Sequence, residues 1–288
     1  MEKHRREKPK NQFIEVLGRL SMNKGAMLGM IILLAIVVLA FVAPLIMPYD
    51  YNQMDIQNKF LGPCKEHLFG TDQYGRDVFS RILYGAKYSL ILGIGSIIVS
   101  TCGGIILGAI SGFFGGITDN VIMRLCDVIQ SVPGMILNIA LACVLGTGIF
   151  NTVLALGIGG VAGTARLMRA SILKVRKMDY LEAAVSSNCS STRIIIKHVL
   201  PNSFSPIIVQ ATMGVGARII GAAGLSYLGL GVQPPLPEWG AMLTAGRDFI
   251  KQYPYLTLIP GLCIAIVVLS LNLFGDGLRD ALDPKLKK

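Results

Sequence analysis

The chain has 288 residues, of which 52% are hydrophobic and only 15% are charged. This composition excludes an ordinary soluble domain of this size, and the length excludes a protein with a single membrane span. The formal net charge of +10 arises largely from three basic segments beside long apolar runs, which argues for membrane topology rather than nucleic-acid binding.

Stretches without charged residues predict six membrane-spanning helices, because a span needs about 20 consecutive, mostly apolar residues. We place them at residues 26–47, 88–111, 122–145, 150–170, 204–228 and 256–275. The first apolar run follows a basic segment but is too long for a signal peptide, so we expect it to remain as a span. The sequence thus predicts an all-α integral membrane fold.

Lysine and arginine residues predict the orientation of these helices, since cytoplasmic segments carry an excess of them. Seven lie in the first 24 residues, seven between Arg166 and Lys197, and four between Arg279 and the end of the chain. With six spans these three segments share one side, so both termini and the loop after the fourth span are predicted to be cytoplasmic. Loop 48–87, with five basic and five acidic residues, faces the opposite side.

The predicted spans divide the chain into five parts. These are a basic cytoplasmic N-terminal tail (1–25), the first span (26–47), an extracytoplasmic loop with an interfacial helix reaching to Tyr84 (48–87), a helical core with the cytoplasmic loop 171–203 (88–277), and a cytoplasmic C-terminal tail (278–288).

Single residues predict local features along the helices. Arg124 and Asp127 are spaced to pair on one helix face, and the Pro133-Gly134 dipeptide predicts a kink in the third span. Trp239, the only tryptophan, is expected at the membrane interface. Gly275 is expected to end the last helix, and Asp276 to start a short cytoplasmic one.

Two predicted spans carry glycine at helical spacing. The second has Gly104, Gly108 and Gly112, and the fourth has Gly159 and Gly163. Residues four apart lie on one face of a helix, where the absence of side chains lets another helix approach closely. We expect both faces to pack against helices, either of this chain or of a partner.

The loop after the fourth span has the pattern of two capped helices. Asp179 followed by Glu182 forms a capping box, and Asn188 suits a left-handed helix end. One of the serines that follow can cap a second helix, which Pro201 is expected to end. A loop that only joined two spans would not need this much local order.

This loop resembles the EAA loop of permease subunits from bacterial ABC importers. The match rests on Glu182-Ala183-Ala184, the three isoleucines 194–196 and Leu200-Pro201. The family's glycine is replaced here by Asn188, which tolerates the left-handed conformation. In the family this loop fits a groove on the ATP-hydrolysing subunit.

Three further stretches resemble the dipeptide, oligopeptide and nickel branch of the same family. They are residues 67–77, where Leu68 stands in place of the family's proline, 225–240 and 272–284. The resemblance therefore covers nearly the whole chain, with several motifs in the right order.

The resemblance implies a type I ABC importer permease, and within it the second, C-type subunit of the pair. It implies coupling to the ATPase through Glu182, Ala183, Ala184, Asn188, Ile195, Leu200 and Pro201. The implied partners are a homologous second permease in a heterodimer, two ATPase subunits that hold ATP and Mg, an extracytoplasmic solute-binding protein and the lipid bilayer. The implied location is the bacterial cytoplasmic membrane, and the implied cargo is dipeptides or oligopeptides.

Arg218 lies well inside the fifth predicted span, where a charge is costly and normally faces a bundle interior, a cavity or a partner. Glycines around it, including Gly214 and Gly221, are expected to leave open space. One hypothesis is that Arg218 lines the translocation path with Gly214 and Gly221 and favours anionic groups such as a peptide carboxylate. The alternative is that it pairs with an acid on the partner subunit.

The sequence lacks the motifs of a catalytic chain. There is no phosphate-binding P-loop, no zinc-binding His-Glu-x-x-His pair and no nucleophile beside a base, so we expect neither an enzyme nor a chain with its own cofactor, metal or disulfide. Three alternatives to a peptide importer remain. They are a nickel or other small-solute importer of the same family, an ion-coupled transporter, which would need acids at the centres of its spans, and a membrane scaffold without transport activity. Only His67 and Cys64 lie in the outer loop as candidate metal ligands, which favours peptides over nickel.

Overall fold

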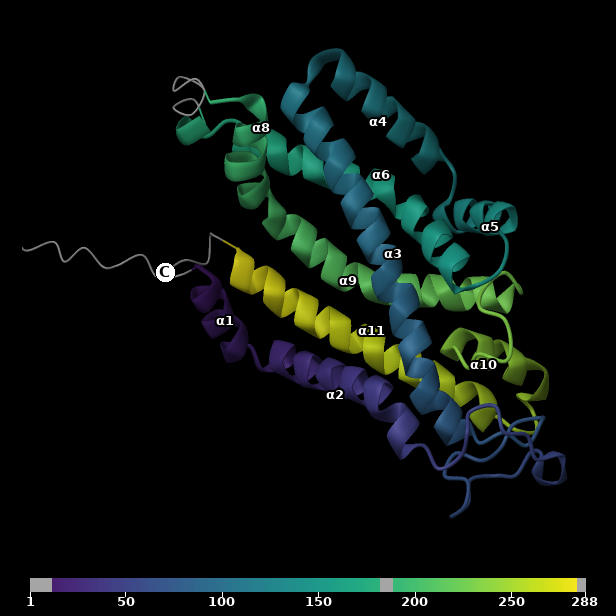
Figure 1. Ribbon diagram of the computed structural model, residues 1–288. Coiled ribbons are helices and arrows are strands. Elements are labelled where there is room, and N and C mark those ends of the chain that lie inside the picture. The colour runs from purple at the N-terminus through teal and green to yellow at the C-terminus, as the bar shows by residue number, and fades with distance from the viewer. Residues whose placement is uncertain (1–11, 182–188, 284–288) are drawn as a thin grey trace, which may run out of the picture.

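The computed structural model describes residues 12–181 and 189–283 and is built almost entirely from helices (Figure 1). The elements are α1 (Gln12–Met22), α2 (Lys24–Ile46), η1 (Ile56–Asn58), α3 (Val78–Phe114), α4 (Gly116–Ser131), α5 (Gly134–Leu145), α6 (Ile149–Val175), α8 (Ser191–Ile194), the π-helical turn η2 (Ile195–Val199), α9 (Leu200–Tyr227), α10 (Trp239–Gly246), η3 (Arg247–Phe249) and α11 (Tyr255–Leu282). Within the described ranges, α2, α3, α6, α9 and α11 are long and apolar enough to cross a membrane, and α4 with α5 makes a sixth span if the bent pair counts as one.

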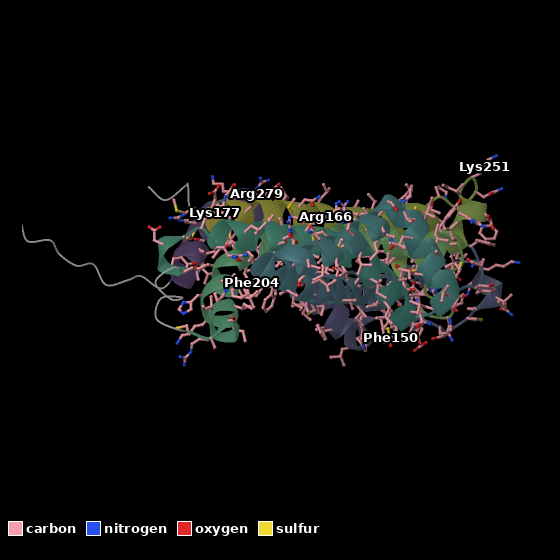
Figure 2. All side chains as sticks on the ribbon, turned by 90° about the horizontal axis from the view of Figure 1, so that it is seen from above. Phe150, Arg166, Lys177, Phe204, Lys251 and Arg279 are labelled. Atoms are coloured by element: carbon pink, nitrogen blue, oxygen red, sulfur yellow. The ribbon has the colours of Figure 1, made fainter. Side chains whose placement is uncertain are left out.

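The long helices lie side by side, and the polar structures gather at their two ends. In Figure 1, α1, α8 and the end of α11 lie at one end, whereas the 47–77 loop and α10 lie at the other. Figure 2 shows Lys177 and Arg279 near the first end and Lys251 near the second. The side chains between them consist mostly of carbon and are therefore largely apolar. This is the distribution expected of a helical bundle in a bilayer.

Helix α3 forms the centre of the bundle and packs most extensively on α6. Its glycines make this contact possible, because a Cβ at Gly104 would overlap Thr164, one at Gly108 would overlap Met168, and one at Gly112 would press on Ile172. The glycine face of α3 therefore lies against a helix of the same chain rather than at its outer surface.

Helix α3 begins ten residues earlier than the sequence predicted. The Asp77 carboxylate accepts a hydrogen bond from the Ser80 backbone N–H at 2.7 Å and caps the helix at its N-terminus. The predicted interfacial helix reaching to Tyr84 is therefore wrong, because these residues are the first turns of one continuous helix that runs to Phe114.

The third predicted span is not one kinked helix. Its two parts, α4 and α5, meet at an angle of 92° across Val132 and Pro133. Proline disfavours helical geometry in the residue before it, and Val132 accordingly takes an extended conformation. The dipeptide thus produces a full corner where a kink was expected.

The last two long helices also extend beyond their predicted ends. Pro201 does not end a helix but lies in the first turn of α9, which follows the π-helical turn η2 directly. The wider π turn, in which the Leu200 N–H donates to the Ile195 carbonyl, accommodates a proline ring that would clash in a regular α-helix. Likewise Gly275 and Asp276 lie inside α11, which continues to Leu282, so the predicted separate cytoplasmic helix is wrong.

The predicted N-terminal tail contains an ordered helix. Asn23 separates α1 from α2, and its side chain caps α2 by accepting the Ala26 N–H at 3.1 Å. Leu20 of α1 is buried in a small apolar cluster with Ala26 and Ala281. Helix α1 is therefore anchored on the end of α11.

Candidate functional site

The 179–201 segment is the first candidate site, and only part of it can be described. Glu182, Ala183, Ala184 and Asn188 lie outside the described residues. On either side of them, Asp179–Leu181 is helical and α8 begins at Ser191. The start of α8 directly after Ser190 agrees with the predicted serine cap, whereas the Asp179–Glu182 capping box stays a prediction because Glu182 lies outside the described residues.

The described parts of this segment are anchored on the membrane helices. Leu181, Ile194 and Val199 are buried in one apolar cluster with Met168 and Ile172 of α6. The same cluster includes Ile207 of α9. The segment is therefore packed on α6, which precedes it in the chain, and on α9, which follows it. A displacement of the segment would therefore also move these two helices.

The outer face of the same segment is apolar as well as basic. Met178, Tyr180 and Ile196 are 41%, 39% and 61% exposed. Ile195 and Leu200 are half-buried, whereas Pro201 is exposed. Exposed apolar side chains beside lysine and arginine are typical of a surface that another protein covers.

Two ion pairs join α4 to α6. The Arg169 guanidinium donates two hydrogen bonds of 2.5 Å to the Asp119 carboxylate, and Ser111 of α3 also donates to it. Arg166 pairs with Asp127 at 2.5 Å, and the predicted Arg124–Asp127 pair is confirmed at 3.5 Å. The sequence did not predict that Asp119 would link α3 to α6, because no sequence pattern relates Asp119 to Arg169, fifty positions away.

Arg218 of α9 points at α6. A Cβ at Gly160 would collide with the Arg218 guanidinium, which is half-buried. No carboxylate in the described parts of the chain pairs with this guanidinium, and no acceptor there forms a hydrogen bond with it. Arg218 is therefore a cation inside a predicted span that this chain does not neutralise within its described residues.

The glycines around Arg218 do not leave open space, contrary to expectation. A Cβ at Gly214 would overlap Ile97 of α3, and one at Gly221 would press on Leu156 of α6. They are sites of close helix packing, because α9 crosses both helices there.

The glycine face of α6 contacts α4 and α5. Gly159 lies under the Asn138 side chain of α5, and Gly163 faces Gln130 of α4. The Asn138 Oδ1 atom is fully buried and accepts no hydrogen bond from the described residues. Sequence reasoning missed Asn138, a polar residue in an apolar run, which is itself the signal that could have identified it.

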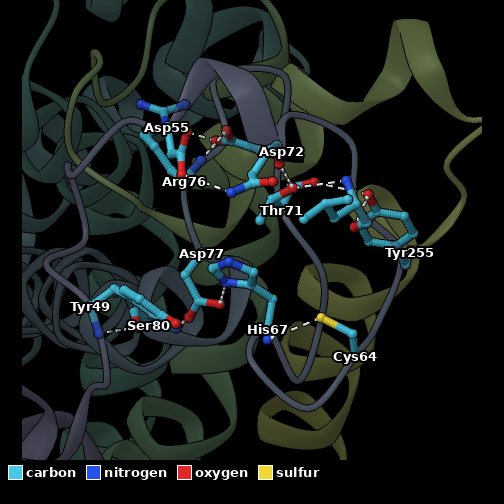
Figure 3. Close-up of polar contacts among 12 residues, drawn as sticks. Tyr49, Asp55, Cys64, His67, Thr71, Asp72, Arg76, Asp77, Ser80 and Tyr255 are labelled. Carbon is cyan, nitrogen blue, oxygen red and sulfur yellow. Dashed lines mark hydrogen bonds and ion pairs between the residues drawn. The ribbon is translucent and has the colours of Figure 1, made fainter.

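The opposite end of the bundle carries a polar cap, formed by residues 47–77 and 229–254. His67 Nδ1 lies 2.9 Å from Asp77 Oδ1, and Tyr49 stacks on the imidazole with ring centroids 4.8 Å apart (Figure 3). The Tyr255 hydroxyl lies 2.9 Å from the Leu61 carbonyl and 2.8 Å from the Thr71 carbonyl, which share its single proton. His67 therefore has a structural role in holding the loop on α3.

Glu238 joins residues 229–254 of the polar cap to α3 and α9. The sequence analysis did not identify this residue. Its buried carboxylate accepts hydrogen bonds from Ser89 of α3, Ser226 of α9 and the N–H groups of Gly240 and Ala241. Burial raises the pKa of this carboxyl, while these four donors pull it down. An acid just before a helix start is the sequence signal that could have indicated this cap.

Trp239 is 2% exposed, and its Nε1–H donates to the Ile82 carbonyl at 3.0 Å. Trp239 is therefore packed inside the protein, and its position at the membrane interface stays a prediction. The indole fills the space between α10 and the start of α3, where a large side chain with one donor fits.

The fold and its two ends define a multi-pass α-helical membrane protein with a helical loop segment at one end and a hydrogen-bonded polar cap at the other. Residues 104–288 match the family described as binding-protein-dependent transport system inner membrane component, and residues 11–63 match the N-terminal TM domain of oligopeptide transport permease C. The chain belongs to this family of ABC importer permeases, which are transport components of the inner membrane without enzymatic activity of their own.

Relatives of known function are similar over most of the chain. The dipeptide transport system permease protein DppC of Alkalihalophilus pseudofirmus is 43% identical over 95% of this chain and 90% of its own length. The glutathione transport system permease protein GsiD of Pectobacterium atrosepticum is 45% identical over 90% of this chain and 86% of its own. The di/tripeptide transport system permease protein DppC of Pseudomonas aeruginosa is 42% identical over 92% and 89%.

Two solved transporters share the fold at low sequence identity. An inward-facing MetNI methionine ABC transporter superposes with a TM-score of 0.59 at 16% identity, over 70% of this chain and 96% of that chain. An amino acid ABC transporter crystallised with histidines gives a TM-score of 0.51 at 18% identity, over 72% and 95%.

Proposed function

We propose that this chain is one of two permease subunits of an ATP-driven importer for dipeptides or short oligopeptides. The observation that carries the proposal is the 43% identity with a dipeptide permease over 95% of the chain. Two ATPase subunits and a solute-binding protein would complete the importer, with a homologous permease as the other half of the pathway. ATP and Mg belong to the ATPase subunits, and the polar cap faces the solute-binding protein.

The 179–201 segment is the part that couples transport to ATP hydrolysis. Its apolar, basic outer face suits a groove on another protein, and its inner face is packed on α6 and α9. Glu182, Ala183, Ala184 and Asn188 would enter the groove, and Ile195, Leu200 and Pro201 would carry the displacement into α9. This is a lever between two packed states rather than a binding site for substrate.

Arg218 lines the translocation path in this proposal. A guanidinium that has no partner among the residues the structure describes needs an anion, and the C-terminal carboxylate of a peptide supplies one. The absence of a side chain at Gly160 lets the guanidinium approach α6, and Gly214 and Gly221 bring α9 close to α3 and α6.

Glutathione is a second candidate substrate, because relatives at 44–45% identity are named as glutathione permeases. It is also a peptide with free carboxylates, so the chemistry at Arg218 would be the same.

The experiment is uptake of a labelled dipeptide and of labelled glutathione, measured together with copurification of the ATPase. The variant is Glu182→Lys, and the control is Asp276→Lys, the same charge reversal on an exposed residue of α11 that lies outside both the 179–201 segment and the polar cap. We expect Glu182→Lys to lose the ATPase or uncouple uptake, while Asp276→Lys retains both. Normal uptake with an intact complex in Glu182→Lys would overturn the coupling role, and uptake of neither substrate by the wild type would overturn the peptide assignment.

A further inference from the structure

Two arginines are buried side by side in the polar cap, where the loop meets the start of α3. Arg76 and Arg81 are each 5% exposed, and Asp72 beside them is 6% exposed. Buried charges are normally paired one to one, because an uncompensated buried charge is strongly destabilising. The cluster has two cations and one anion.

Asp72 forms a close hydrogen-bonded pair with Arg76 and only a longer ion pair with Arg81, so one carboxylate is shared between two guanidinium groups. Its Oδ2 atom accepts the Arg76 Nε–H at 2.7 Å, and its Oδ1 atom accepts the backbone N–H groups of Tyr74 and Arg76. Arg81 Nε lies 3.7 Å from Oδ2, which is too far for a hydrogen bond. Among the residues that the structure describes, Asp72 is the only acid paired with either guanidinium.

Most guanidinium N–H groups of this cluster have no acceptor within residues 12–181 and 189–283. Arg81 donates from Nη1 to the Tyr51 carbonyl at 2.8 Å, and Arg76 lies over the Tyr74 ring at 4.7 Å. A guanidinium has five N–H donors, so several on each arginine remain without a hydrogen bond to the described chain. The two like charges also repel each other.

A small cavity lies next to both arginines. Its volume is about 20 Å³, and Asp72, Gln73, Arg76 and Arg81 form its polar side. Ala245 and Leu256, from the α10–α11 region, form part of its apolar side. A cavity must offer about 10–15 Å³ to hold one water molecule, so the space beside the two arginines suits one particle of about that size, such as a small ion.

We propose that this cavity binds one small monovalent anion of the size and charge of chloride, held between Arg76 and Arg81. The anion supplies the missing negative charge and accepts N–H groups that the protein leaves unsatisfied. It joins the loop of the polar cap to α3 and to the α10–α11 corner, so its first effect is on the stability of the cap.

The test is the thermal stability of the purified importer complex in chloride and in gluconate at equal ionic strength. We expect the Tm of this subunit to rise saturably with chloride, by about 2–4 °C, a shift typical of a modest stabilisation in a chain of this size. Bromide should replace chloride, and sulfate, which is too large for the cavity, should not. A Tm that does not distinguish chloride from gluconate would overturn the proposal.

A matched pair of variants separates this site from a general salt effect. Arg81→Gln should abolish the chloride dependence, whereas Arg247→Gln, which removes an exposed arginine of the same cap, should retain it. An equal chloride response in all three proteins would contradict the site. If Arg81→Gln does not fold, anomalous scattering from bromide-soaked crystals of the wild type decides the matter. A bromide peak between Arg76 and Arg81 supports the proposal, and its absence there refutes it.

Discussion

Glu238 shows how much one buried side chain contributes to this fold. Four donors from three helices converge on its carboxylate, so removing it would leave two backbone N–H groups and two hydroxyls unsatisfied at once. A buried donor left without a partner costs about 1–3 kcal/mol. We expect Glu238→Ala to lower the Tm of the complex by several degrees, measured by thermal unfolding, and more than Glu66→Ala, in which the replaced carboxylate is exposed. Equal Tm values for the two variants would show that the network contributes nothing.

The same residue predicts a pH dependence. Because burial raises the pKa of Glu238, its folded state takes up a proton more readily than the unfolded chain. The stability it contributes is therefore complete below the unfolded pKa of about 4.3 and declines as the pH rises through the folded pKa. Glu238→Gln cannot titrate, so we expect the wild type to lose Tm relative to this variant between acidic and neutral pH. Parallel Tm profiles over that range would contradict the assigned direction.

Among the helices, α3 and α6 form the most extensive contact, and glycines of α3 make it possible. A side chain at Gly108 meets the Ala165 carbonyl and Met168, neither of which can move without separating the helices. Overpacking of this kind costs about 1–3 kcal/mol. We expect Gly108→Val to reduce the amount of folded permease in the membrane, measured by its resistance to protease. Gly18→Ala in α1, where a Cβ meets nothing, serves as the control and should leave the amount unchanged.

The elements also show which parts of the fold a sequence determines. Apolar length predicted the five long helices α2, α3, α6, α9 and α11, because a bilayer fixes how many residues a spanning helix must contain. It could not predict helix ends outside the apolar region, so the continuation of α3 to Asp77 and of α11 past Gly275 was missed. The corner at Pro133 was underestimated because a proline predicts a break but not its angle. At the candidate sites, spacing identified Arg218 as an isolated charge, whereas the Asp72–Arg76–Arg81 cluster and the donors around Glu238 depend on contacts between distant segments.

For the whole molecule, the orientation in the bilayer decides which end faces the cytoplasm, and two native cysteines can test it. Cys64 is exposed in the polar cap, and Cys189 lies half-buried beside α8 at the opposite end. The basic segments predict that the α8 end is cytoplasmic. In single-cysteine variants, we expect a membrane-impermeant maleimide to label Cys64 in spheroplasts with intact membranes and Cys189 only after permeabilisation. The reverse pattern would show that the topology is inverted.

Helix α3 has 37 residues and is therefore about 55 Å long, nearly twice the thickness of a typical hydrocarbon core. A helix of this length must either lie oblique to the membrane normal or project from it. Because α6 follows α3 along most of its contact surface, a thinner or thicker lipid layer that changes the slope of α3 would also turn α6 and the segment attached to its end. The length of the lipid chains is therefore expected to change the tilt of α3 and α6 in this permease. Reconstitution in bilayers of graded thickness would test this effect.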